Sequence, residues 1–294
     1  MKNQIRSILK VPDDKTLDTL VEDIYSLLDP SADHVVSEEN LEKAAQDFKD
    51  VLRASTRLRE DPVDPLRFSS LGKQDRQIWH QSRGTEGEDM TPNTYLKFLY
   101  GHIIENMLLF LAKEAGHTVT DEQREIEVDG VLGHIDAIID GVVVDVKSAS
   151  PFGYQKFVNG NVITDDPFGY IKQLSGYSNV LTPDQAPAFI AMDKVSGNVT
   201  VMNVSTSITS DHKPEPRIAH LRDVIASDTP PPICYEPVPD GKSGNMKLDT
   251  GCSYCKYKKS CFPNARKFIY SNGPRYLTTV ARMPKDTVLE IKDW

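Results

Sequence analysis

The hydrophobic period of the chain changes between residues 92 and 149, and this change restricts the fold more than any other feature. From about Pro92 to Ala115, apolar side chains recur at helical spacing, namely Tyr95, Phe98, Leu99, Ile103, Met107, Leu108 and Phe110. Three short β-branched runs follow, which are EIEVDG (125–130), VLGHIDAIID (131–140) and VVVDVKSA (142–149). Asp140-Gly141 is a favoured two-residue turn. The pattern predicts a long helix followed by three antiparallel strands.

The order of the later elements predicts an α/β fold. A helix is expected from about Pro167 to Val180, followed by strands in AFIAMDK (188–194) and NVTVMNV (198–204). The segment from His212 to Gly244 is rich in proline and polar residues, which favours a connection over the surface. We therefore expect a mixed sheet flanked by helices.

Residues 1–65 form an acidic region with two segments of helical spacing, LDTLVEDIYSLL (17–28) and LEKAAQDFKDVL (41–52). The link DPVDPL (61–66) ends this region, because proline removes a backbone donor and restricts the residue before it. Three parts are predicted: an accessory helical region (1–65), a core (66–230) and a cysteine-bearing, basic C-terminal segment (231–294).

The net charge of −9 argues against a protein that coats nucleic acid by bulk attraction, so contact with DNA requires a local basic patch. Residues 251–285 contain no Asp or Glu, but they contain Lys256, Lys258, Lys259, Arg266, Lys267, Arg275, Arg282 and Lys285. A solvated basic tail is the alternative. No stretch of about 20 apolar residues is present, and the first residues lack the pattern of a signal peptide. We expect a cytoplasmic protein without membrane contact.

Two carboxylates and a lysine are expected to meet across the Asp140-Gly141 turn. Asp136 falls on the second predicted strand and comes close to opposite Asp145 on the third, while Asp145 and Lys147 share one strand face. Phosphodiester hydrolysis uses a divalent cation to polarise the phosphate and activate water, and hard oxygen ligands favour magnesium or manganese. The alternative is an exposed hairpin, since D-x-K is common by chance.

Three motifs in order resemble the RecB-like branch of the PD-(D/E)XK nuclease superfamily, which is marked by G-x-x-D, D-x-K and Q-x-x-x-Y. They are Gly133-His134-Ile135-Asp136, Asp145-Val146-Lys147 and Gln173-Leu174-Ser175-Gly176-Tyr177. The resemblance covers roughly residues 100–205 and implies a restriction-endonuclease-like core. It also implies that Asp136, Asp145 and the Val146 carbonyl bind the cation, and that Lys147 orients or activates the attacking water.

The same resemblance implies further site residues. Family members place a ligand, usually His, in a G-x-x-x-H motif, and here Glu105 occupies that position after Gly101, with His102 as a second candidate. Gln173 and Tyr177 are expected beside the site, contacting DNA or holding the lysine; a buried amide and a core aromatic are the alternatives. The aromatic residues Phe152 and Tyr154, expected in a loop, either stack on unpaired bases or pack.

All four cysteines lie after residue 230, and three of them form the compact run Cys252-x2-Cys255-x5-Cys261. Two disulfides suit a secreted protein, but without a signal peptide a metal site is favoured, with Cys234 completing four ligands. Four soft ligands accept either zinc or an iron–sulfur cluster.

RecB-like nucleases with an iron–sulfur cluster, including AddAB-type nuclease subunits and CRISPR adaptation nucleases, end in a similar C-x2-C-x5-C run that binds [4Fe-4S]. Their fourth cysteine precedes the core. Residues 70–79 resemble the neighbourhood of that cysteine, but Gln74 or its neighbour stands in its place. The resemblance therefore implies that Cys234 replaces the missing ligand, and zinc stays open. Arg76 and Trp79 are expected near the cluster or on DNA, or else in ordinary interdomain packing.

The resemblance implies a DNA exonuclease that acts on single strands or duplex ends in phage-type replication, recombination or repair, together with a strand-annealing or replication protein. A phage-encoded protein would act in the host cytoplasm. No G-x-x-x-x-G-K-[ST] phosphate loop is present, so unwinding of DNA is not expected. A structure- or sequence-specific endonuclease and a non-catalytic, zinc-containing nucleic-acid-binding module are the alternatives.

Overall fold

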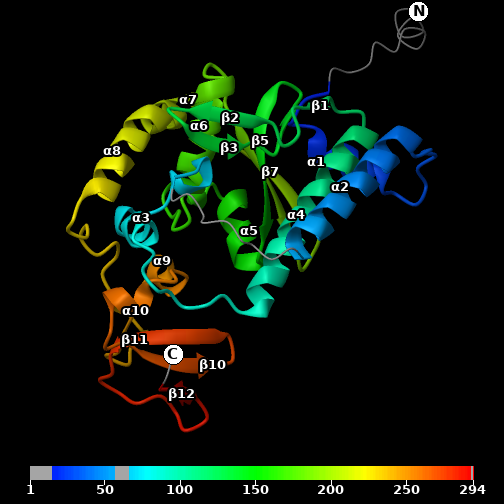
Figure 1. Cartoon of the computed structure of the whole chain (residues 1–294). Helices are drawn as coiled ribbons and strands as arrows, with labels where there is room; N and C mark the ends of the chain where they lie inside the picture. Colours follow the sequence, from blue (N-terminus) through cyan, green and yellow to red (C-terminus); the bar gives the residue numbers. More distant parts are fainter. Residues whose placement is uncertain (1–14, 57–65, 293) are drawn as a thin grey trace, which may run out of the picture.

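The computed structural model describes residues 15–56, 66–292 and 294 (Figure 1). Its helices are α1 (Leu20–Leu27), α2 (Glu38–Thr56), α3 (Asp75–Ser82), α4 (Pro92–Glu114), α5 (Pro151–Val158), α6 (Tyr170–Leu181), α7 (Thr206–Thr209), α8 (Pro214–Ala226), α9 (Thr250–Ser253) and α10 (Lys258–Cys261), with the 3-10 turns η1 (Phe68–Ser70), η2 (Asn161–Ile163) and η3 (Ser210–His212). Its strands are β1 (Val119–Thr120), β2 (Glu125–Val128), β3 (Val131–His134), β4 (Ala137–Ile139), β5 (Val142–Ala149), β6 (Ala188–Asp193), β7 (Val199–Asn203), β8 (Val238–Pro239), β9 (Met246–Lys247), β10 (Arg266–Tyr270), β11 (Gly273–Thr279) and β12 (Leu289–Ile291).

The central sheet has the strand order β1-β4-β5-β6-β7. β5 and β6 run parallel, and the other neighbours run antiparallel. β5 is apolar on both faces, since Val143, Val144 and Val146 are all buried. A strand of this kind needs cover on both sides. The predicted mixed sheet flanked by helices is therefore confirmed.

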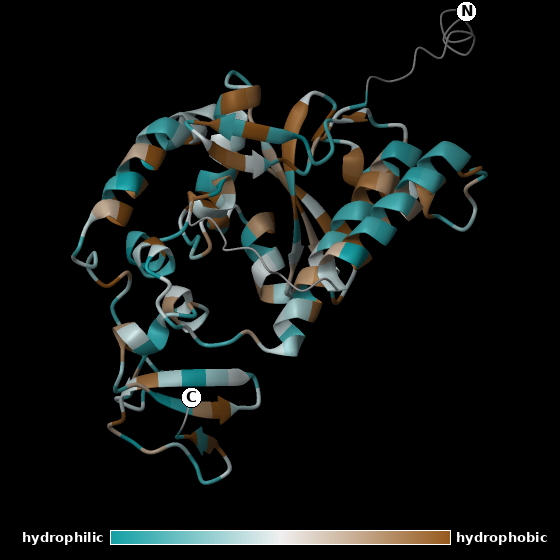
Figure 2. Cartoon of the chain, in the orientation of Figure 1, coloured by the Kyte–Doolittle hydropathy of each residue, from teal (hydrophilic) through white to brown (hydrophobic). Residues whose placement is uncertain are grey.

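Two apolar clusters cover the faces of the central sheet. One joins the sheet to η1, α5, α6 and α8, and the other joins it to α1 and α4. Leu20 and Ile24 of α1 are buried in the second cluster beside Leu108 of α4. By contrast, α2 lies along α4 without a buried residue of its own, and Figure 2 shows it as mostly hydrophilic. Both N-terminal helices lie where the sequence predicts them, but α1 is part of the core packing.

The division into three parts remains a prediction, and most of the link DPVDPL lies outside the described residues. The helix from about Pro92 to Ala115 is confirmed as α4. Its buried face differs from the predicted one, because Ile104, Leu108, Leu109 and Ala112 are buried while Tyr95, Phe98 and Met107 are exposed. The N-terminal half of α4 extends beyond the sheet, which explains its exposed aromatics.

The prediction of three strands between residues 125 and 149 is wrong, because the second run is split into β3 and β4. β2 and β3 form a separate hairpin. At the split, the Ile135 N–H donates to the Arg124 carbonyl at 3.2 Å, and the Gln123 N–H donates to the Asp136 carbonyl at 3.1 Å. The chain at the split therefore satisfies its backbone groups with the preceding loop and leaves the ladder of the central sheet.

Two helices occupy segments for which the sequence predicts loops. α5 begins after Ser150, whose hydroxyl accepts from the Gly153 N–H at 3.2 Å, and α8 begins at Pro214. Proline is tolerated in the first helical turn, where its missing N–H has no intrahelical partner. The prediction of a surface connection from His212 to Gly244 is therefore wrong for α8, which buries Ile218, Leu221 and Val224. The buried apolar face of α8 is what holds it on the core.

The C-terminal segment forms a second, antiparallel sheet in the order β12-β10-β11-β9-β8, which the sequence analysis did not predict (Figure 1). Four residues of the predicted basic patch pair with acids, namely Lys258 and Lys267 with Glu88, Arg266 with Glu290, and Arg275 with Asp240. Fewer basic side chains of this patch are therefore without an acidic partner than the sequence predicts. Within 15–56 and 66–292, no helix is long and apolar enough to cross a membrane.

Glu88 is expected to fix the second sheet to the core in a pH-dependent way. Its carboxylate pairs with Lys258, which is buried, and lies 2.7 Å from Lys267 Nζ. Burial opposes ionisation, but the hydrogen bonds from both lysines outweigh it and lower the pKa of Glu88 below 4.5. The stabilisation is therefore present above pH 4.5 and is lost as pH falls through the lowered pKa.

We predict that Glu88→Gln lowers the free energy of unfolding by about 2 kcal/mol at pH 7, because it leaves two lysines with a neutral partner. A fully buried ion pair would contribute more, but solvent partly screens this one. The difference from the unchanged protein should shrink below about pH 4. Urea unfolding at both pH values measures it, with exposed Glu86→Gln as control. A constant difference across this range would contradict the ion-pair explanation.

Gly72 and Gly169 touch each other through their backbones, which brings the loop before α3 against the start of α6. A Cβ on Gly72 would lie 2.1 Å from the Gly169 oxygen. We predict that Gly72→Ala costs at least about 3 kcal/mol, since the contact is with backbone that cannot move aside. In Gly153→Ala, the added carbon meets Ser150 Oγ at 3.4 Å, an ordinary contact, so this helical variant should be stable in the same denaturation experiment.

Candidate active site

Asp145 and Lys147 lie two residues apart on β5, and their side chains meet on one face of the strand. The Lys147 ammonium forms an ion pair with Asp145 Oδ2. Asp145 is only 2% exposed, and Oδ2 is a buried atom that accepts no hydrogen bond of normal geometry from the described residues. The lysine is therefore the single close counter-charge that the described part of the chain supplies to this oxygen.

Asp136 is held beside β5 by a backbone hydrogen bond. The Val146 N–H donates to Asp136 Oδ2 at 2.6 Å. Asp136 is placed between β3 and β4 instead of on a strand, which corrects the prediction. Ala137 pairs with Val144 in the β4–β5 hairpin, so the preceding residue, Asp136, comes next to Asp145. Val146 contributes its N–H in this arrangement, and the contribution predicted for its carbonyl stays a prediction.

Glu105 reaches the site from α4. Gln123 Nε2 donates to Glu105 Oε1 at 2.5 Å, while the Gln123 backbone N–H binds the Asp136 carbonyl. Gln123 therefore links two candidate ligands that are 31 positions apart in sequence. Sequence reasoning missed this residue, which lies in a turn without a motif. His102 Nδ1 lies 3.8 Å from Glu105 Oε2, so it accompanies Glu105 on the same side of the helix.

Burial and neighbouring charges raise the pKa of both aspartates. Burial and then the charges of Asp145 and Glu105 raise the pKa of Asp136 well above its ordinary value. Burial also raises the pKa of Asp145, with Lys147 acting against this change. Burial disfavours the charged form of Lys147, but the two aspartates outweigh it and raise the pKa of the ammonium. The site therefore contains more negative charge than Lys147 alone compensates.

Tyr177 and Gly133 are explained by packing. The Tyr177 ring is 3% exposed and stacks on Phe68 at 5.2 Å between centroids. A Cβ on Gly133 would lie 2.4 Å from Phe68 Cβ, so the glycine of the G-x-x-D motif leaves room for the Phe68 side chain. Gln173 Nε2 donates to Tyr177 Oη at 3.5 Å. Burial and the nearby carboxylates raise the pKa of Tyr177 to about 12, so this ring supports the site wall with a neutral hydroxyl.

Asp166 and Tyr170 belong to the site, although sequence reasoning missed them. The Asp166 carboxylate accepts from the N–H groups of Gly169, Tyr170 and Ile171 at 2.8–3.0 Å, so α6 starts at Tyr170 and not at Pro167. Lys147 Nζ lies 4.9 Å from the Tyr170 ring centroid, a cation–π distance. An Asp shortly before a predicted helix is a capping signal that could have identified Asp166.

Phe152 and Tyr154 lie on α5 and not in a loop. Tyr154 is buried, and its hydroxyl donates to the Val199 carbonyl at 3.3 Å. It therefore packs in the core, which is the second of the two alternatives given for it. Phe152 is exposed, with Lys156 Nζ at 5.6 Å from its ring centroid.

The chemistry of the donors at the acidic site suits a divalent cation. Asp145, which is buried, and Asp136, which is partly buried, lie near one lysine, and Asp145 Oδ2 lacks a hydrogen bond within the described residues. Across the same residues, however, no three His, Cys, Asp or Glu side chains stand where they could hold a metal ion together. The carboxylates therefore have the charge of a magnesium or manganese site, and cation binding would require them to approach one another.

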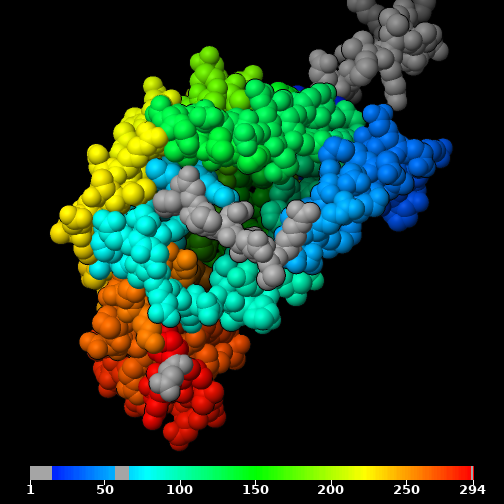
Figure 3. Space-filling model, viewed as in Figure 1, coloured from blue at the N-terminus to red at the C-terminus, as the bar shows by residue number. Residues whose placement is uncertain are grey.

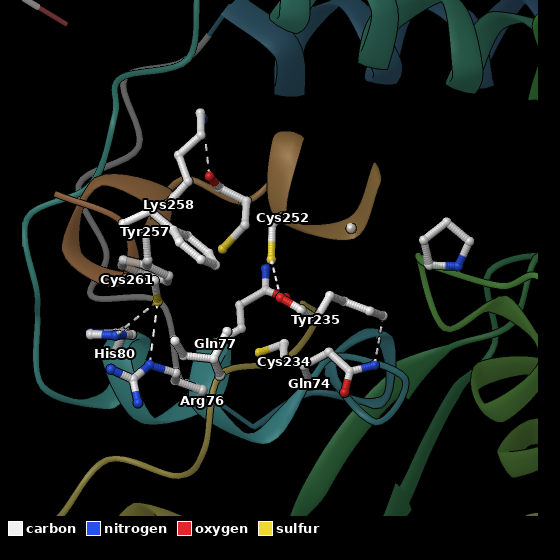
Figure 4. A pocket seen from close by; sticks show the side chains of 15 residues that line it. Gln74, Arg76, Gln77, His80, Cys234, Tyr235, Cys252, Tyr257, Lys258 and Cys261 are labelled. Carbon is white, nitrogen blue, oxygen red and sulfur yellow. Dashed lines mark hydrogen bonds between the residues drawn. The ribbon is translucent and has the colours of Figure 1, made fainter. Parts of the chain in front are cut away.

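A cavity of about 30 Å³ is lined by all four cysteines (Figure 4). Cys252, Cys255 and Cys261 come from the α9–α10 segment and Cys234 from the loop before β8, and all four are free thiols. Burial and the neighbouring thiolates raise the pKa of Cys252 to about 12. In the view of Figure 4, the Gln77 side chain is seen between Cys234 and Cys252. The four sulfurs converge without forming a closed metal cage.

α3 forms the opposite wall of the cysteine cavity. Arg76 Nε donates to Cys261 Sγ at 3.3 Å, and His80 Nε2 lies 3.8 Å from the same sulfur. Gln74 also lines the cavity, and its Nε2 donates to the Tyr235 hydroxyl at 2.8 Å. Trp79 instead donates to the Ser227 carbonyl at 2.9 Å, so it packs against the loop after α8. Gln74, Arg76 and His80 therefore line the same cavity as the four cysteines.

Comparison with solved structures gives distant likenesses. The chain is similar to a solved structure described as the crystal structure of SSO0001, with a TM-score of 0.37 and 15% sequence identity, over 73% of this chain and 92% of the other. No protein-family model matches the sequence, and no curated protein is detectably similar to it. Neither a family nor a function follows from a likeness of this degree.

Proposed function

We propose that the protein is a divalent-metal-dependent nuclease that hydrolyses DNA phosphodiester bonds. The observation that carries the proposal is the excess of buried negative charge around Asp136 and Asp145, with the Lys147 ammonium beside them. Two carboxylates close together, one buried and one partly buried, are costly when a single lysine compensates their charge, unless a cation joins them. Hard oxygen ligands favour magnesium or manganese for this role.

Glu105, Asp136 and Asp145 would hold the cation, which when bound would polarise the scissile phosphate. The Val146 N–H fixes Asp136, and Gln123 fixes Glu105, so both carboxylates are oriented before DNA arrives. The ion pair with Asp145 keeps Lys147 protonated and in place. Its ammonium can then orient the attacking water and neutralise charge that develops on the phosphate.

The four cysteines would hold a [4Fe-4S] cluster, or zinc as the alternative. Either group would join the loop at Cys234 to the segment Cys252–Cys261 and so stabilise the α9–α10 region against α3. No catalytic step is assigned to it. Buried and partly buried thiols whose pKa is raised by burial and by neighbouring thiolates fit this role, because coordination converts them to thiolates that share one positive centre.

Exonuclease action on single strands or duplex ends is the proposed mode. The test is incubation of anaerobically purified protein with linear and circular single-stranded DNA and with linear duplex, each in magnesium or manganese. Release of nucleotides from linear DNA alone supports an exonuclease. Cleavage of the circle would instead support an endonuclease on the same site.

A non-catalytic nucleic-acid-binding module is the second candidate. The observation that favours it is that the described residues contain no preformed group of three metal-binding side chains at the acidic site. This candidate predicts that DNA binding persists while every DNA stays intact in magnesium and in manganese. Metal analysis of the same preparation would then find metal only at the cysteines.

A further inference from the structure

A row of aromatic rings leads from Lys147 to the cysteine segment. Tyr170 is in cation–π contact with Lys147, and its ring centroid lies 5.5 Å from that of Phe168. The Phe168 centroid in turn lies 5.6 Å from that of Tyr254, which stands between Cys252 and Cys255. The planes of the two rings make an angle of 61°, an edge-to-face arrangement that is energetically favourable. The row therefore connects the two sites identified above through direct ring contacts.

The outer rings of this row face solvent on a fixed backbone. Phe168 is 46% exposed and Tyr254 is 73% exposed. The loop that carries Phe168 is held by the three hydrogen bonds to Asp166 and by the close backbone contact of Gly169 with Gly72. Pro167 of the same loop lines the cysteine cavity. Exposed aromatic rings on a rigid support can bind a ligand without first being ordered, which removes an entropic cost.

Positive charge lies beside the same rings. Lys73 directly follows Gly72, and burial together with the charges of Lys256 and Arg67 lowers the pKa of its ammonium. Lys73 follows the glycine whose backbone touches Gly169 of the Phe168 loop, and Lys256 lies two residues after Tyr254. Exposed rings flanked by cations suit a ligand that has both aromatic faces and anionic groups.

We propose that Tyr170, Phe168 and Tyr254 form a binding track for unpaired nucleotides, along which a single DNA strand reaches Lys147. The inference rests on the proposed nuclease function and adds the form of the substrate. Stacking needs an unpaired base with an open face, which a base pair within a duplex does not present. Lys73 and Lys256 would accompany the phosphates, and the loop carrying Phe168 would hold the strand at a fixed distance from the acidic site.

The test compares binding of a fluorescent thymidine dodecamer in calcium with hydrolysis of bis(p-nitrophenyl) phosphate, an ester too small to reach Tyr254. Tyr254→Ala and Phe168→Ala are each expected to weaken dodecamer binding about tenfold. Tyr254→Trp should bind as the unchanged protein does, and Tyr254→Leu, which keeps apolar bulk without a ring, should lose as much as alanine. Ester hydrolysis is measured in the same four variants, and a loss of dodecamer binding in the alanine variants without an equal loss of ester hydrolysis supports the track. Phe48→Ala on α2 removes another exposed ring and serves as the matched control.

The two proposals fail in different ways. Dodecamer binding that is unchanged in both alanine variants would overturn the track, whatever the activity of the unchanged protein. If the unchanged protein hydrolyses neither DNA nor the ester, the nuclease function fails, while selective loss of binding in Tyr254→Ala still supports the track. Equal losses for duplex and single-stranded DNA would also overturn it, because stacking on these rings requires unpaired bases. The metal content and the melting temperature are measured for each variant. They show whether a substitution weakens DNA binding by disturbing the neighbouring cysteines.

Discussion

Lys147→Met is expected to lower the single-turnover rate of magnesium-dependent DNA cleavage by about 10³-fold, with DNA binding in calcium nearly unchanged. Methionine keeps most of the side-chain volume and its contact with Tyr170, but it removes the only ammonium paired with Asp145 among the described residues. The attacking water and the charge on the phosphate then lose their positive partner. The loss belongs to the chemical step, so the rate constant for cleavage should fall far more than the affinity.

Lys156→Met is the matched control for this substitution. Lys156 Nζ lies 2.6 Å from Asp165 and 5.6 Å from the ring centroid of Phe152, so it too combines an ion pair with an aromatic ring. It lies on α5 and pairs with Asp165 instead of with Asp136, Asp145 or Glu105, so its loss should leave cleavage within about twofold. Circular dichroism and thermal unfolding establish that both variants fold. Full cleavage by folded Lys147→Met would remove this lysine from the mechanism.

The positions of Asp136, Asp145 and Lys147 relative to one another could be predicted from the sequence, because they depend on one turn and one strand. The turn Asp140-Gly141 has both residues at positive φ, and the two-residue connection fixes the register that brings Asp136 beside Asp145. The alternation of side chains along β5 places Lys147 with Asp145. These relations depend on residues within twelve positions of each other. Glu105, by contrast, was expected at the site only through the resemblance, since spacing alone does not bring α4 to the hairpin.

Contacts between distant segments could not be predicted. The split between β3 and β4 depends on the loop at Gln123 and Arg124, which satisfies the backbone at Ile135 and Asp136. The VLGHIDAIID run itself reads as one strand, because its apolar residues give no sign of that loop. The stacking of Phe68 on Tyr177 joins segments 109 positions apart and has no periodic signal.

Other misses had signals in the sequence. Ser150-Pro151 is a capping residue followed by proline, which is typical of a helix start, and Asn272-Gly273 is typical of the hairpin that joins β10 and β11. Proline usually ends a helix, so Pro214 and Pro216 indicate a loop. Both fall in the first turn of α8, where proline is tolerated. Position within an element, and not residue type alone, decides what proline does.

Cys234→Ser is expected to reduce the bound metal to less than half and to lower the melting temperature by roughly 10 °C. Coordination of a structural metal contributes to folding directly, and loss of one of four thiolates should cost about 4 kcal/mol or more. Ser260→Ala, an exposed residue of α10, is the control and should retain full metal content. Absorption near 400 nm in the unchanged protein would identify an iron–sulfur cluster, and a colourless, zinc-loaded protein would identify the alternative.

The double variant Cys234→Ser, Gln74→Cys is expected to regain metal and most of the lost thermal stability. Gln74 and Cys234 line the same cavity, so a thiol at position 74 would approach the other three cysteines from α3 instead of from the loop before β8. The single variant Gln74→Cys measures the cost of losing the hydrogen bond to Tyr235. Rescue by the double variant would mean that a thiol at position 74 can replace Cys234 as the fourth ligand. Four reactive thiols and an unchanged melting temperature in metal-free protein would contradict a structural metal at this site.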